Sequence, residues 1–92
     1  MDILYIDIET YATVDLPTVG EYRYVEDHEF EILMAGWALN DDPVQVALGE
    51  DAIRDIPGLD DPSVLKVAHN ANFERACFSH FFGCDLPYEY LP

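Results

Sequence analysis

The chain has 92 residues, with 19 acidic side chains against 4 basic ones and a formal net charge of −15. A chain of this size forms one small domain and buries roughly 60–65% of the surface that its unfolded form exposes. The apolar fraction of 50% and the aromatic fraction of 13% exclude an intrinsically disordered acidic tail. The shortage of basic side chains excludes a protein that binds nucleic acid non-specifically through an extended basic surface.

The sequence carries no sign of membrane insertion or secretion. No apolar run approaches the roughly 18 residues of a membrane span, and no basic segment precedes a secretory core. Two cysteines, Cys77 and Cys84, are too few for a disulfide scaffold or a cysteine-rich zinc site. We therefore expect a cytoplasmic protein with both thiols reduced.

The first half of the chain predicts strands joined by a long irregular loop. Residues 3–10 are apolar on both alternating faces and predict a central, covered strand, with Asp7 and Glu9 at its C-terminal end on one face. Residues 11–30 predict a loop with one helical turn. Residues 31–39 and 43–48 flank the turn sequence Asn-Asp-Asp and predict a β-hairpin.

The second half predicts a helix, a strand and a second helix. Residues 50–56 predict a short helix, and residues 64–69 a buried strand. Asn70 can cap a helix over residues 71–82 that stops at Gly83. No regular element is expected beyond it. The core-facing stripe of that helix is predicted to be Phe73, Ala76, Cys77, His80 and Phe81. The order β-β-β-α-β-α predicts an α/β mixed sheet flanked by helices.

Two acids mark the end of the first predicted strand. Asp7 and Glu9 are two residues apart, so their side chains leave the same face about 7 Å apart. Two like charges at the end of a buried strand are unfavourable unless a cation lies between them. Mg²⁺ or Mn²⁺, which take oxygen ligands, meet that need. The alternative is that both carboxylates are simply solvated.

A second polar group runs from the last predicted strand into the last helix, with the sequence His-Asn-Ala-Asn-Phe-Glu-Arg over residues 69–75. Glu74 is placed one turn into the helix, near its positive end, where a carboxylate is favoured. If the two strands are neighbours, Glu74 projects over the same sheet edge as Asp7 and Glu9, where ligands of open α/β sheets gather. The alternative is an ordinary surface pair of Glu74 and Arg75.

These residues resemble the motifs of a known family. Asp7-Ile8-Glu9-Thr10 resembles the first motif, D-x-E-T, of the DEDD 3′–5′ exonucleases, and residues 68–75 resemble the second. The chain is most similar to the proofreading domain that opens phage-type family A DNA polymerases, over nearly all of its length. The resemblance implies an incomplete RNase H-like fold. It also implies a location in the cytoplasm of a bacterium or of a phage-infected host cell.

The resemblance also implies a two-metal site for Mg²⁺ or Mn²⁺. Asp7 would bridge both ions, Glu9 would hold the ion that activates the attacking water, and Glu74 would reach the second ion. Glu74 stands where most of the family has Asp, so its reach is longer by one methylene and the metal spacing differs.

Three further residues are expected to bind the substrate. Thr10 would contact the terminal nucleotide. Asn70 either caps the helix or touches the substrate. Arg75 is the best candidate for a phosphate contact.

The family's third motif, an Asp on a later helix preceded by Tyr or His, has no match in the expected place. Two local matches have a suitable spacing: His80 and Asp85 fit His-x₄-Asp, and Tyr11 and Asp15 fit Tyr-x₃-Asp. The first pair straddles the predicted helix stop, and the second directly follows the first motif. We therefore expect residues 1–92 to form a single partial exonuclease domain that lacks the third motif.

The predicted function is that of an N-terminal portion of a metal-dependent exonuclease, which hydrolyses terminal phosphodiesters at the 3′ end of single-stranded DNA. Without the third motif we expect the isolated chain to be weak or inactive, since such positioning contributes roughly 10²–10⁴-fold. We also expect an exposed apolar edge that pairs with a second copy or with the missing segment. The alternative function is a non-catalytic acidic interaction module, either a degenerate remnant or a DNA mimic.

Overall fold

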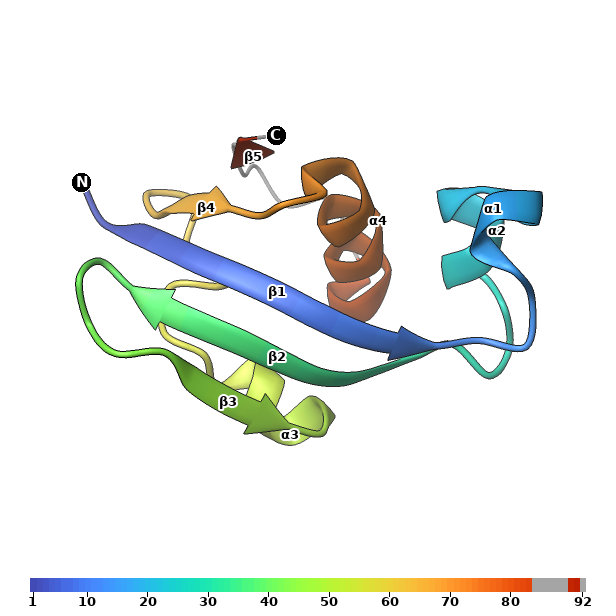
Figure 1. Cartoon of the computed structure of the whole chain (residues 1–92), viewed down its shortest axis with the longest axis horizontal. Helices are drawn as coiled ribbons and strands as arrows, with labels where there is room; N and C mark the ends of the chain where they lie inside the picture. Colours follow the sequence, from blue (N-terminus) through green and yellow to red (C-terminus); the bar gives the residue numbers. More distant parts are fainter. Residues whose placement is uncertain (84–89, 92) are drawn as a thin grey trace.

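The computed structural model describes residues 1–83 and the backbone of residues 90–91. Nine elements follow one another in these residues (Figure 1): β1 (Ile3–Tyr11), α1 (Leu16–Val19), α2 (Glu21–Val25), β2 (Glu31–Leu39), β3 (Gln45–Leu48), α3 (Glu50–Arg54), β4 (Leu65–Val67), α4 (Ala71–Phe82) and β5 (Tyr90–Leu91). Within this part of the chain, no helix is both long and apolar enough to cross a membrane.

The strands form one mixed sheet in the order β3-β2-β1-β4-β5. β1 is antiparallel to β2 and parallel to β4, and β5 is parallel to β4. The predicted α/β class is confirmed, and the mixed sheet with its helices is consistent with the RNase H-like arrangement. The two-residue strand β5 corrects the expectation that no regular element follows the last helix, because its backbone extends the sheet beside β4.

β1 is the central strand, as predicted, but the expectation that both of its faces are covered is wrong for the described residues. Leu4, Ile6 and Ile8 are buried in a core that also contains Ile53 of α3 and Phe78 of α4. Tyr5, on the opposite face, is 45% exposed. Figure 1 shows the reason, since α3 and α4 both lie behind the sheet.

The predicted hairpin is confirmed, and its turn explains where each strand ends. Asn40 adopts φ 54°, a left-handed conformation that Asn tolerates better than most residues. Its backbone N–H donates to the carbonyl of Ile3 at 2.7 Å, which fixes the turn against β1. β3 starts at Gln45 rather than at Pro43, in keeping with the missing N–H of proline.

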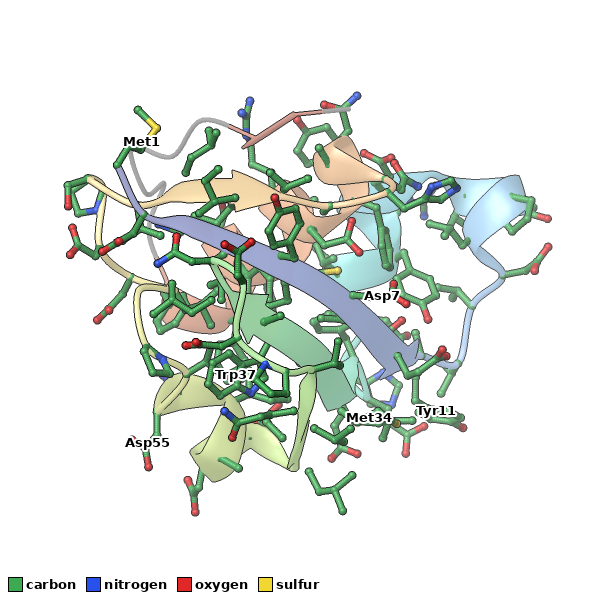
Figure 2. The ribbon with its side chains drawn as sticks, turned by 60° about the vertical axis from the view of Figure 1, so that its left-hand side comes forward. Met1, Asp7, Tyr11, Met34, Trp37 and Asp55 are labelled. Atoms are coloured by element: carbon green, nitrogen blue, oxygen red, sulfur yellow. The ribbon has the colours of Figure 1, made fainter. Side chains whose placement is uncertain are left out.

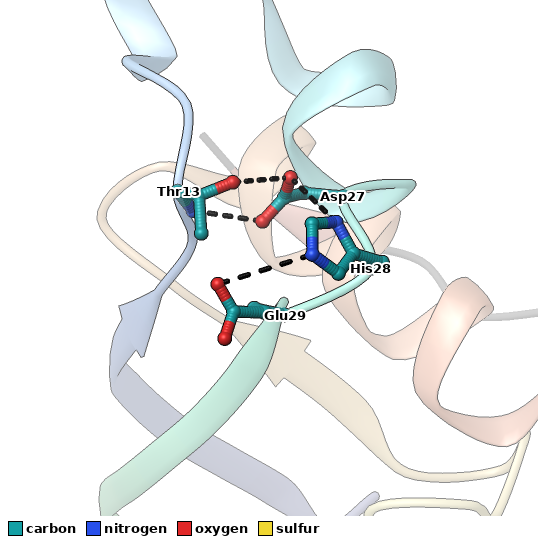
Figure 3. Close-up of polar contacts among 4 residues, drawn as sticks. All are labelled: Thr13, Asp27, His28 and Glu29. Carbon is teal, nitrogen blue, oxygen red and sulfur yellow. Dashed lines mark hydrogen bonds and ion pairs between the residues drawn. The ribbon is translucent and has the colours of Figure 1, made fainter.

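The loop between β1 and β2 holds two short helices rather than the single turn expected. Gly20, at φ 82°, ends α1 and begins α2. The loop is fastened at its base by Asp27, whose carboxylate accepts hydrogen bonds from the backbone N–H and the hydroxyl of Thr13 at 2.7 and 2.6 Å (Figure 3). His28 lies 3.7 Å from the same carboxylate and 4.0 Å from that of Glu29. This clasp sets the loop's position beside the end of β1.

The last helix has the predicted bounds, and its buried face is wider than the predicted stripe. Gly83 ends it in the left-handed conformation, as expected, whereas Asn70 makes no side-chain capping bond and only its carbonyl accepts from the helix. The predicted stripe is confirmed for Ala76 and Cys77, which are buried, and for Phe73 and Phe81, which pack against the core, whereas His80 is exposed. The buried residues are Ala71, Glu74, Ala76, Cys77 and Phe78. A carboxylate therefore lies on the inner face of α4.

Candidate functional site

The candidate site lies where β1 runs past the end of its parallel neighbour. β4 pairs only with Ile3, Leu4 and Tyr5 of β1. The chain then leaves β4 and turns into α4, so the second half of β1 continues beyond the last β4 pair. Carboxyl ends of parallel strands that diverge in this way are where α/β sheets collect ligands. Figure 2 shows Asp7 on this stretch, between Met1 and Tyr11.

Asp7 and Glu9 occupy one face at this end of β1, as predicted. Both are exposed, and in the register with β2 they lie opposite Gly36 and Met34. A Cβ placed on Gly36 would have no atom within 4 Å. The space beside the Asp7 carboxylate is therefore open to a ligand.

Glu74 differs from both in being almost fully buried, with 3% of its surface exposed. Its Oε2 atom has no hydrogen-bond partner among the described residues. The pKa of Glu74 is raised to about 7, chiefly by burial and also by the carboxylates of Asp7 and Glu21, against a lowering by a backbone hydrogen bond. The alternative of an ordinary surface pair with Arg75 is therefore wrong for Glu74, which lies in the interior within electrostatic reach of Asp7.

The three predicted metal ligands are not assembled into a finished site. No group of three His, Cys, Asp or Glu side chains that could hold a metal ion occurs within the described residues. Asp7 lies near enough to help raise the pKa of Glu74, while Glu9 does not complete a trio with them. The donors nevertheless suit a hard divalent cation, since all are carboxylates. Such an ion would give the Oε2 atom of Glu74 the partner that it lacks.

The predicted substrate-binding residues differ in their exposure and hydrogen bonding. The hydroxyl of Thr10 lies 2.9 Å from that of Tyr24 in a half-buried hydrogen bond. Asn70 is exposed at the start of α4, and Arg75 is exposed on the same helix, beside a hollow of about 520 Å³ between α2 and α4. Their roles toward a substrate stay predictions.

The local matches to a third motif lie in places that suit other roles. The carboxylate of Asp15 accepts from the hydroxyl of Thr18 at 2.8 Å, ahead of α1. The ring of His80 packs edge-on against Phe30, with centroids 5.5 Å apart. Asp85 and Cys84 lie outside the described residues.

The sequence did not predict the burial or the electrostatic role of two further charged residues, Glu21 and Lys66. Glu21 of α2 lies close enough to raise the pKa of Glu74, and nothing in the sequence distinguishes it from its acidic neighbours. Lys66 is fully buried, and its Nζ atom donates to the carbonyls of Asp61 and Val64. Burial lowers the pKa of Lys66 to about 8, although the carboxylates of two nearby aspartates oppose this. The alternation along this strand could have predicted the burial of Lys66, because Val64 and Ala68, two residues away on either side, are buried.

Comparison with known proteins gives one relative. The chain is 43% identical over 90 residues to a DNA polymerase from Bacillus phage SP02. The match covers 94% of this chain and 14% of the relative, so the chain corresponds to a small part of that polymerase's length. No family model matches the sequence, and no solved structure matches it. The chain is therefore related to a segment of a phage DNA polymerase.

Proposed function

We propose, starting from this relation to a segment of a phage DNA polymerase, that the chain is the metal-binding portion of a 3′–5′ proofreading exonuclease domain. The observation that carries the proposal is the buried carboxylate of Glu74, whose Oε2 atom lacks a partner within the described structure and which lies near Asp7. Burying a charge without a partner is costly. A protein retains such a group where a cation or a reaction requires it.

The proposed reaction is hydrolysis of the terminal phosphodiester of a DNA strand, with release of a nucleoside monophosphate. Asp7 and Glu9 hold divalent cations from the exposed side, and Glu74 holds them from the interior. The ions supply Lewis acidity and an activated water when bound. Asn70 and Arg75, at the start of α4, contact the strand near the scissile phosphate, and Thr10 lies beside the terminal nucleotide.

We further propose that the isolated chain is weakly active or inactive. No three His, Cys, Asp or Glu side chains of the described residues converge closely enough to hold a metal ion together. An ion held by an incomplete set of ligands would keep more water in its coordination shell, and the attacking water would lack a group that orients it. The missing positioning corresponds to roughly 10²–10⁴-fold in rate.

The proposal is tested by following thermal unfolding while Mn²⁺ is added. An ion that binds only the folded chain raises the melting temperature by mass action, by about 4–8 °C for each kcal/mol of binding free energy. We expect this rise in the wild type and its loss in Asp7→Ala. Asp55→Ala is the matched control, because this exposed aspartate follows α3, away from β1 (Figure 2). Equal responses of all three proteins would refute the metal site.

A second candidate function is a non-catalytic acidic interaction module. It is favoured by the absence of a metal-holding trio from the described residues and by the net charge of −15. A module of this kind presents carboxylates to a basic protein and needs no ion. This function would be favoured over the exonuclease if Mn²⁺ left the melting temperature of the wild type unchanged and the wild type bound a basic DNA-binding protein through its exposed acids.

A further inference from the structure

One face of the sheet lacks a covering layer in the part of the chain that the structure describes. We call it the open face. It carries Tyr5, Asp7 and Glu9 of β1, with their neighbours in the strand registers. The opposite face packs against α3 and α4 in the core. Sheets in α/β domains are stable when each apolar face is covered by another layer.

Much of the open face is apolar and exposed. Val46 and Leu48 of β3 are 57% and 71% exposed, and Tyr5 is 45% exposed. In the strand registers, Val46 lies opposite Gly36 and Tyr5 lies opposite Val67. Tyr5 and Val46 thus lie on two neighbouring cross-strand rows, and the row of Val46 and Gly36 ends at Asp7 of β1. Contiguous exposed apolar patches of this kind mark interaction surfaces.

The face is also hollowed beside Asp7. A cavity of about 470 Å³ is lined by Tyr5, Asp7, Gly36, Ala38, Val44 and Val67, among others. Its floor is made by small residues of β2, and no atom stands within 4 Å of where a Cβ of Gly36 would be. The cavity has room for a bulky side chain of a layer packed onto the sheet.

The charges on this face have one sign. Asp7, Glu9 and Glu31 are exposed, and the register places Glu31 opposite Tyr11, on the same face as Asp7 and Glu9. The basic side chains of the chain lie elsewhere: Arg23 on α2, Arg54 on α3, Arg75 on α4, and Lys66 on the buried face of β4. The open face therefore combines an apolar centre with an acidic margin and no cation.

We propose that the open face binds an amphipathic helix that carries an apolar stripe and Lys or Arg side chains at one end of that stripe. The stripe packs on the rows of Tyr5 and Val46, one bulky side chain fills the cavity, and the basic end pairs with the acidic margin. A second copy of this chain is a poorer occupant. It would bring the same carboxylates and no cation to the contact, and two chains of net charge −15 repel each other.

The test uses two synthetic helical peptides as probes, one of leucine and lysine at helical spacing and one with glutamate in place of lysine. NMR spectra of the full 92-residue chain are recorded with a metal chelator, at about 0.15 M salt, where the Debye length is about 8 Å. We expect the lysine peptide to bind in a 1:1 complex and to shift the amide signals of Tyr5, Gly36, Ala38 and Val67. We expect no binding of the glutamate peptide.

Two matched variants separate the open face from general charge attraction. Val46→Glu adds an acid to an exposed position of the open face, and Ala52→Glu adds one to an exposed position of α3. Neither side chain is buried, so both variants are expected to fold. Val46→Glu should weaken the binding of the lysine peptide at least tenfold, and Ala52→Glu should change it less than twofold.

Three outcomes would overturn the proposal. Equal strengthening of peptide binding by Val46→Glu and Ala52→Glu, each of which adds one negative charge, would mean that the peptide responds only to net charge. Shifts confined to α2 and α4 would place the binding surface elsewhere. A wild-type dimer in sedimentation that Val46→Glu dissociates would make a second copy the occupant. Because the chelator removes metal ions, each result is independent of the exonuclease proposal.

Discussion

Glu74 makes the stability of the metal-free chain depend on pH in an unusual direction. Its pKa is raised from 4.5 to about 7 in the folded chain, chiefly by burial. The folded state therefore holds a proton that the unfolded state has released between these two values. The stabilisation by this proton is fully present below pH 4.5 and is lost as the pH rises through 7. Most surface acids act in the opposite direction.

The size of the effect follows from the shift. A displacement from 4.5 to about 7 corresponds to about 3 kcal/mol of differential stability at about 1.4 kcal/mol per unit. Solvent screening makes this value an upper bound. We expect the free energy of unfolding of the wild type to fall by up to this amount between pH 4.5 and 7.5. In Glu74→Gln, which keeps the shape and cannot ionise, that decline should vanish.

Urea unfolding with a chelator at several pH values measures both slopes. Histidines are present in wild type and variant alike, so their effect cancels in the difference between them. Glu50→Gln is the matched control, because Glu50 is exposed in the first turn of α3; its slope should equal that of the wild type. If Glu74→Gln kept the wild-type slope as well, the argument that Glu74 is a buried, unpartnered acid would be refuted.

Three further predictions concern the residues around the site. Because the pKa of Lys66 is lowered to about 8, the free energy of unfolding of the wild type should rise between pH 8 and 10.5, and urea unfolding of Lys66→Met should show no such rise. Tyr24→Phe removes the hydrogen bond to Thr10 and should cost about 1 kcal/mol in thermal unfolding; an unchanged melting temperature would contradict this. Asp27→Ala should open the clasp and speed amide hydrogen exchange of Thr13, whereas equal exchange in both proteins would show that the clasp does not form in solution.

Local sequence patterns predicted most of the regular elements. Alternating apolar residues located β1, and a turn sequence between two apolar runs located the hairpin of β2 and β3. The bounds of α4 were predicted because Gly83 supplies a left-handed stop. Each of these elements depends on residues that are close together in the sequence, so the sequence alone can predict it. The strand β5 was not predicted, because a two-residue strand gains its hydrogen bonds only from β4.

The site was predicted in its residue types and in part of its geometry. The placement of Asp7 and Glu9 on one face followed from the two-residue period of a strand. The burial of Glu74 did not follow, because the predicted stripe of α4, although mostly confirmed, did not include it. The inner face of α4 is decided by how the helix rests on the sheet and on α2, which involves contacts between distant segments.

An acidic α/β chain, with two carboxylates at the end of a central strand and a third at the start of a helix, follows from the residue pattern alone. Packing between distant segments places Glu74 inside with an unpartnered oxygen, buries Lys66, and leaves a hollow, acid-lined face of the sheet open among the described residues. The division has a physical reason. Strand and helix periods follow from bonded geometry along the chain, whereas burial and its effect on charge follow from which distant surfaces pack together.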